Sequence, residues 1–66
     1  MKAAKATDKQ LDYLLSLINK STGSNHKYFS QARHELGLSS RQADRVTKYE
    51  ASSMIEEWKE KAEAVS

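Results

Sequence analysis

The chain has 66 residues, a formal net charge of +2, and neither cysteine nor proline. A chain of this length forms one small domain that buries only about 60% of its unfolded surface, and without cysteine it has no disulfide and no thiolate metal site. No apolar run approaches the roughly 20 residues of a membrane-spanning helix, and the basic N-terminus lacks the apolar segment of a signal peptide.

The first predicted helix spans about residues 8–20. Residues 1–6 are small and basic, so we expect them to fray and the single domain to cover 7–66. Thr7 and Gln10 have the spacing of a capping box, in which each side chain satisfies the backbone N–H of the other residue. The apolar face of this helix consists of Leu11, Leu14, Leu15 and Ile18, widened by Tyr13 and Leu17.

Turn-forming residues at 21–25 end this helix, and a shorter one is expected over 27–36. Gly37 then takes the left-handed conformation that closes many helices, and Leu38 folds back onto the helix. Residues 40–45 form either an additional helical turn or an extended or 3₁₀ connector.

The last predicted helix spans about residues 48–62. It begins with a second capping box at Thr47 and Glu50, where Val46 packs on Ala51. Its apolar stripe has helical spacing and consists of Ala51, Met54, Ile55, Trp58, Ala62 and Val65. The sequence therefore predicts an all-α, three-helix domain.

Charge is unevenly distributed along the chain. Residues 20–48 carry six basic and two acidic residues, whereas residues 50–66 carry five acidic and two basic ones. A basic segment interleaved with aromatic residues is typical of nucleic-acid binding, although a solvated helix face or a site for an acidic protein has the same composition. The candidate contacts are Lys27, Arg33, Arg41, Arg45 and Lys48 for phosphates, and Tyr28 and Tyr49 for stacking on bases.

Residues 32–46 also resemble a helix-turn-helix segment, with L-G-L-S as the turn. In that motif the first residues of the second helix contact base edges, and the candidate base or phosphate contacts here are Ser40, Arg41, Gln42 and Arg45. The motif's small residue normally lies four positions before the glycine, where this chain has Arg33.

The sequence favours a non-enzymatic protein without a cofactor. Two histidines, His26 and His34, do not provide the three or four ligands of a zinc site. No nucleophile–base pair or phosphate-binding glycine loop is present, and so short a chain should leave no room for a pocket of about 300 Å³. A membrane-surface role is not expected, because the last helix has an acidic polar face.

Two motifs, A-T-D-K-Q from Ala6 and V-T-K-Y-E-A-S-S-M-I from Val46, resemble a small helical module of bacteria and their phages. Its pattern is A-T-x-K-Q followed by L-T-K-x-E-A-S-x-x-I, and the match covers about residues 6–58, with conservative departures at Asp8 and Val46. The module occurs alone or at the ends of phage and mobile-element proteins of recombination and replication.

The resemblance implies a bacterial cytoplasmic setting and work beside DNA, but it supplies no catalytic residue. Among the matching positions, only Lys9 and Lys48 are candidates for contact, because the others are helix caps or core residues. The module has a linking segment where a recognition helix would lie. The sequence therefore predicts a nucleic-acid-binding module or, alternatively, a module that docks on a larger protein. It does not identify the partner, the type of nucleic acid or the oligomeric state.

Overall fold

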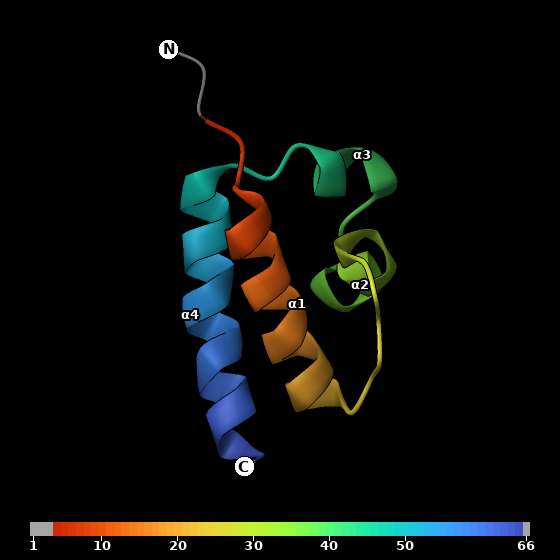
Figure 1. The fold of residues 1–66 in the computed structure, drawn as a ribbon, viewed down its shortest axis with the longest axis vertical. Coiled ribbons are helices and arrows are strands. Elements are labelled where there is room, and N and C mark those ends of the chain that lie inside the picture. The colour runs from red at the N-terminus through yellow and green to blue at the C-terminus, as the bar shows by residue number, and fades with distance from the viewer. Residues whose placement is uncertain (1–3, 66) are drawn as a thin grey trace.

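The computed structural model describes residues 4–65 and contains four helices in that range. They are α1 (Asp8–Thr22), α2 (Phe29–Leu36), α3 (Ser40–Asp44) and α4 (Lys48–Ala64). α4 packs along one side of α1 and α2 packs against the other, while α3 packs on α2 (Figure 1). The predicted all-α, three-helix class is confirmed, and the alternative of an additional turn is realised as α3. No helix in the described range combines the length and apolarity that a bilayer crossing requires.

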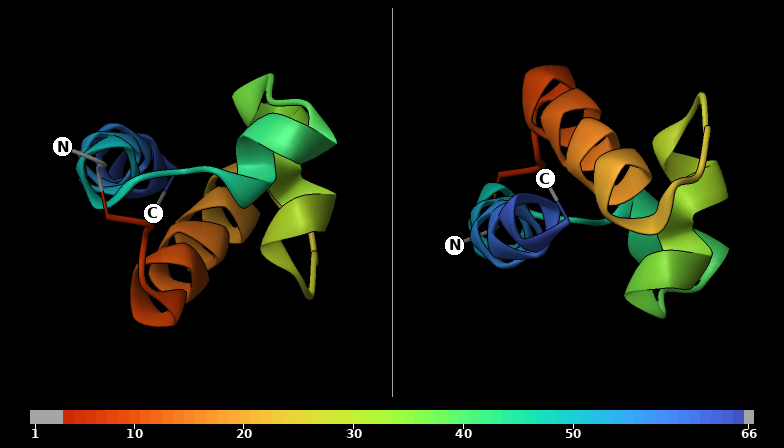
Figure 2. Two further views of the ribbon diagram at one scale, coloured as in Figure 1. Left: turned by 90° about the horizontal axis from the view of Figure 1, so that it is seen from above. Right: turned by 90° about the horizontal axis from the view of Figure 1, so that it is seen from below.

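α1 is the central helix of the domain. It lies between α4 and the α2–α3 unit when the molecule is viewed along its long axis (Figure 2). α1 and α4 run parallel, and both begin at the same end of the molecule (Figure 1). Side chains of α1, α2 and α4 form one core, whose buried members are Leu14, Leu15, Leu17, Ile18, Ala32, Trp58 and Ala62.

Two residues expected in the core are exposed instead. Tyr13 is 46% exposed and Val65 is 57% exposed. α4 has 17 residues and α1 has 15, so α4 extends about 3 Å beyond α1 at a rise of about 1.5 Å per residue. Val65 follows α4 and therefore lies beyond the surface that α1 could cover.

The predicted capping boxes are confirmed. Gln10 N–H donates to Thr7 Oγ1 at 3.1 Å, and Glu50 N–H donates to Thr47 Oγ1 at 3.1 Å. Each N3 side chain accepts the N–H of its own cap residue at 3.0 Å. A third box begins α3, where Gln42 N–H donates to Ser39 Oγ at 3.2 Å.

α2 begins two residues later than predicted. Gln31 Oε1 accepts hydrogen bonds from the N–H groups of Lys27 and Tyr28 at 2.8 and 3.1 Å. These two residues therefore precede the helix and are not part of its first turn. At the other end Gly37 has φ +70°, as expected for a left-handed cap.

Residues 4–6 are held by the start of α4. Ala6 N–H donates to Val46 O and Lys48 N–H donates to Ala4 O, both at 2.9 Å, around an antiparallel bridge between Lys5 and Thr47. In place of the fraying expected for residues 1–6, these three residues form a short strap, and residues 1–3 lie outside the described range. The strap aligns the first turns of the two long helices.

The connection between α1 and α2 is fixed by one side chain. Asn19 Nδ2 donates to His26 O at 2.9 Å, and His26 N–H donates to Asn19 Oδ1 at 3.0 Å. Gly23, at φ +71°, turns the chain out of α1. The side-chain amide of Asn19 thus pairs with both the N–H and the C=O of His26, a residue that lies outside the helices.

We predict that Trp58→Ala largely unfolds the domain. The indole is only 7% exposed, and removing a buried tryptophan costs about 3–5 kcal/mol, which is comparable to the stability of so small a domain. Thermal unfolding followed by circular dichroism measures the effect. Tyr49→Ala, on the same helix but 81% exposed, should leave the midpoint nearly unchanged, and equal effects of the two substitutions would contradict the core assignment.

We also predict that Asn19→Ala lowers the free energy of unfolding by about 1–3 kcal/mol, because it removes two partly buried hydrogen bonds and leaves the His26 backbone unpaired. Chemical denaturation measures this loss. Asn25→Ala is the matched control, since Asn25 is exposed in the same connection. A loss as large in the control would show that the Asn19 bridge is not the cause.

Candidate binding site between α3 and α4

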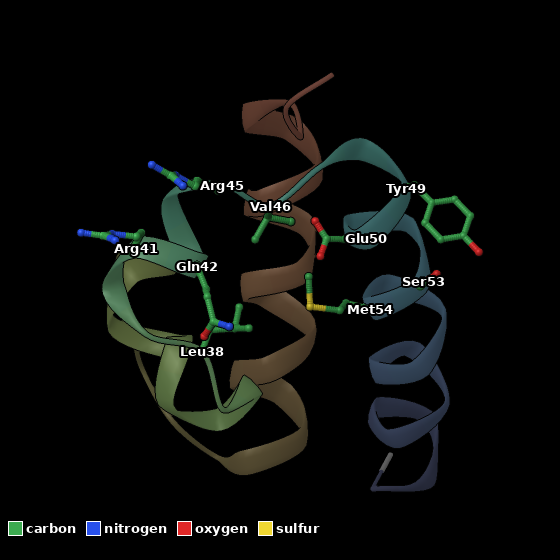
Figure 3. Close-up of a pocket in the computed structure, with 9 residues that line it drawn as sticks. All are labelled: Leu38, Arg41, Gln42, Arg45, Val46, Tyr49, Glu50, Ser53 and Met54. Atoms are coloured by element: carbon green, nitrogen blue, oxygen red, sulfur yellow. The ribbon is translucent and has the colours of Figure 1, made fainter. Parts of the chain in front are cut away.

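A groove separates α3 from α4. Because α3 has only five residues and packs on α2, it does not reach α4. The open space between them has a volume of about 490 Å³. Figure 3 shows the residues that line it: Leu38, Arg41, Gln42, Arg45, Val46, Tyr49, Glu50, Ser53 and Met54.

The floor of the groove is apolar. Leu38 and Met54 are half-buried, so they remain accessible from the groove, whereas Val46 is only 6% exposed. Glu50 also points into the groove (Figure 3). Its Oε1 accepts hydrogen bonds from the backbone N–H and the hydroxyl of Thr47, both at 3.0 Å, so this carboxylate is already engaged in capping α4.

Arg41 and Arg45 form the α3 rim of the groove. Arg41 lies in α3 and Arg45 is the C-cap residue that follows it, four positions later. Both guanidinium groups project to the same side, away from α4 (Figure 3). Both residues are exposed. The ion pairs found within residues 4–65, His26–Glu35 and Lys61–Glu57, involve neither of them. This rim therefore carries two positive charges available to a partner.

α4 contributes two other predicted contacts. Tyr49 is 81% exposed, but its ring points away from the arginine rim (Figure 3). Lys48 is exposed at the first position of α4, where its carbonyl oxygen accepts from Gln10 Nε2 at 3.4 Å. Three of the predicted contacts thus line one groove, namely Arg41, Arg45 and Tyr49. Lys48 directly precedes Tyr49 in the chain.

The remaining predicted contacts are placed elsewhere. Arg33 is half-buried, and its Nη1 donates to Leu38 O at 3.1 Å, which supports the turn after α2. Lys27 and Tyr28 precede α2 and do not line the groove. Tyr28 is nevertheless 67% exposed, so it remains free to contact a partner. The structure therefore divides the predicted set into a group at the groove and a group around α2.

The helix-turn-helix hypothesis predicted the order of elements from 32 to 46, but the second helix, which that motif uses as its recognition helix, is only the short α3. At about 1.5 Å per residue, the five residues of α3 extend only about 7.5 Å. Gln42, a proposed base contact, donates its backbone N–H to Ser39 and accepts from the Ser39 N–H at 2.9 Å. Its side-chain oxygen is therefore used in capping, which does not support base reading by α3.

Within residues 4–65 no three His, Cys, Asp or Glu side chains are grouped to hold a metal ion. His26 Nε2 lies 3.5 Å from Glu35 Oε2, and the two side chains form an ion pair only when the imidazole is protonated. A second hollow of about 270 Å³ lies between Leu11, Phe29 and Asp44. The expectation that the chain has no room for a pocket was wrong, because the short α3 leaves the start of α4 uncovered.

Comparisons with protein-family models, with curated proteins and with solved structures find no match to this chain. The resemblance to the phage helical module therefore rests on the two sequence motifs, whose capping residues the structure places at the starts of α1 and α4.

Sequence reasoning missed the groove because its floor residues were assigned to the core or its edge. Met54 belongs to the apolar stripe of α4, and Leu38 was expected to fold back on α2. The signal that could have revealed the groove is the distance from the Ser39 cap to the Thr47 cap, which limits α3 to little more than one turn.

Proposed function

We propose that this domain is a non-enzymatic module that binds nucleic acid through the arginine rim of α3. The observation that carries the proposal is the pair Arg41 and Arg45, exposed on one side of α3 without an ion-pair partner in residues 4–65. Exposed arginines contact phosphate oxygens by charge-assisted hydrogen bonds. Two contacts four positions apart would fix a sugar–phosphate backbone along α3.

Further positively charged side chains lie at the same end of the molecule as the arginine rim. Lys48 is the first residue of α4, Lys9 lies in the first turn of α1, and Lys5 lies three residues before α1. All three are exposed. α1 and α4 both begin at this end (Figure 1), and each helix N-terminus carries about half a positive charge. Asp8 and Glu50 offset part of this charge, so the attraction is centred on α3 rather than on the helix ends.

Exposed aromatic rings would add contacts to unpaired bases. Tyr49, beside Lys48, is 81% exposed, and Tyr28, beside Lys27, is 67% exposed. Stacking on an aromatic ring contributes about 1–3 kcal/mol per base in single-strand complexes. Arg33 is not among the proposed nucleic-acid contacts. It stabilises the fold, because its guanidinium donates a hydrogen bond to Leu38 O.

The motif resemblance supports a setting for this activity. Modules with the same A-T-x-K-Q and T-K-x-E-A-S patterns occur alone or at the ends of phage and mobile-element proteins of recombination and replication. We therefore place the proposed activity in the DNA metabolism of a phage or mobile element within the bacterial cytoplasm.

Titration with labelled single- and double-stranded DNA at two salt concentrations tests the proposal. We expect an affinity that falls as salt rises, because each phosphate contact releases a condensed counterion. Arg41→Gln and Arg45→Gln should each weaken binding and reduce the salt slope by about one on duplex DNA.

Lys20→Gln is the matched control, because it removes one exposed charge at the opposite end of α1. It should change the affinity less than either arginine substitution does. Absence of binding at low salt, or an affinity that does not depend on salt, would remove the proposal. Equal losses for Lys20→Gln and Arg41→Gln would show non-specific attraction without a site on α3.

Docking on a protein is a second candidate function. It is favoured by one observation that nucleic-acid binding does not explain, namely the apolar floor formed by Leu38, Val46 and Met54.

A further inference from the structure

We infer that the groove between α3 and α4 binds an acidic, amphipathic helix of a protein partner. The partner helix would insert a large apolar side chain between Leu38, Val46 and Met54 and direct carboxylates toward Arg41 and Arg45. This inference goes beyond the proposed nucleic-acid binding, because it assigns a separate ligand to the groove.

The groove has the size and lining of a docking site. Its volume of about 490 Å³ falls within the range of roughly 300–1,000 Å³ that is typical of ligand sites. Leu38 and Met54 are only half-buried, so both present apolar surface that the domain itself leaves partly uncovered. Covering this surface would gain the hydrophobic free energy that α3, with five residues, is too short to provide.

Charge complementarity determines the chemistry of the partner. The lining carries two positive charges, on Arg41 and Arg45, and one negative charge, on Glu50, so positive charge is in excess. Oε1 of Glu50 is held toward the start of α4 by hydrogen bonds from Thr47 at 3.0 Å. An acidic partner would pair with the arginines, and a basic partner would be repelled by them. Acidic residues four positions apart on a helix match the spacing of the two arginines along α3.

Backbone pairing in this region favours a helical partner over an added strand. The connection between α3 and α4 beside the groove already pairs with residues 4–6 through Val46 O and Lys48 N–H. Thr47 N–H donates to Glu50 Oε1. An incoming strand would therefore find few free backbone groups, whereas a helix satisfies its own and needs only side-chain contacts.

Selection from a displayed library of random 12-residue peptides tests the inference. Wild-type protein is the target, and a Ser53→Glu variant is used for counter-selection. Ser53 lines the groove and is exposed, so this substitution adds a negative charge to the groove without altering the core. We expect enriched peptides to share Asp or Glu residues together with one or two large apolar residues at helical spacing.

Fluorescence polarisation of the enriched peptides then locates the site. We expect Ser53→Glu, Met54→Gln and the double variant Arg41→Gln/Arg45→Gln each to weaken binding at least about tenfold, as for truncated anchor residues in interfaces. Ser52→Glu is the matched control on the same helix, outside the groove, and it should retain binding. A thermal unfolding midpoint for each variant identifies any variant that has lost its fold. Ser53 is exposed, so we expect Ser53→Glu to stay folded and its peptide affinity to test the site.

Three outcomes would overturn the inference. They are a selection without enrichment, an enriched set that is not acidic, and peptides that bind Ser53→Glu and Ser52→Glu equally well. The DNA titration is separate from these results, because Met54→Gln removes no charge and should leave DNA affinity unchanged. Loss of DNA binding in Met54→Gln, without loss of peptide binding, would assign the groove to nucleic acid instead.

Discussion

The breadth of the apolar surface on α1 determines how the rest of the domain is arranged. Leu14, Leu15, Leu17 and Ile18 are all buried, and Leu14 and Ile18 completely so. At about 100° per residue, these four positions spread over an arc of about 160°, which exceeds the roughly 100° stripe of a surface helix. One neighbouring helix cannot cover such an arc. α4 therefore packs on one side of α1 and α2 on the other, and α3 is left on the outside of α2.

The features that the sequence predicted are those with local causes. Thr7–Gln10 and Thr47–Glu50 act within one turn, and Gly37 closes α2 by its own backbone preference. Features that join distant residues were not predicted. The strap formed by residues 4–6 involves backbone groups alone and leaves no pattern of side chains. The later start of α2 came from Gln31, whose side chain accepts from two N–H groups.

The candidate site was predicted in part, for the same reason. Charge identified Arg33, Arg41 and Arg45 together, but composition cannot show that Arg33 is bonded to Leu38 O while the others project outward. Likewise, helical spacing identified Met54 as apolar and inward-facing without showing that it packs at the edge of the core and stays partly open to the groove. Both distinctions depend on where the short α3 ends in space, which is a property of the assembled fold.

The parallel packing of α1 and α4 also has a consequence for how the chain acquires its structure. The two helices are joined by residues 23–47, so their contacts form only after this long loop closes, at an entropic cost that local helix pairs avoid. The chain is synthesised from its N-terminus, so α1 is complete long before α4. The apolar side of α1 that α4 covers must therefore stay exposed on the ribosome until the last helix has left the exit tunnel.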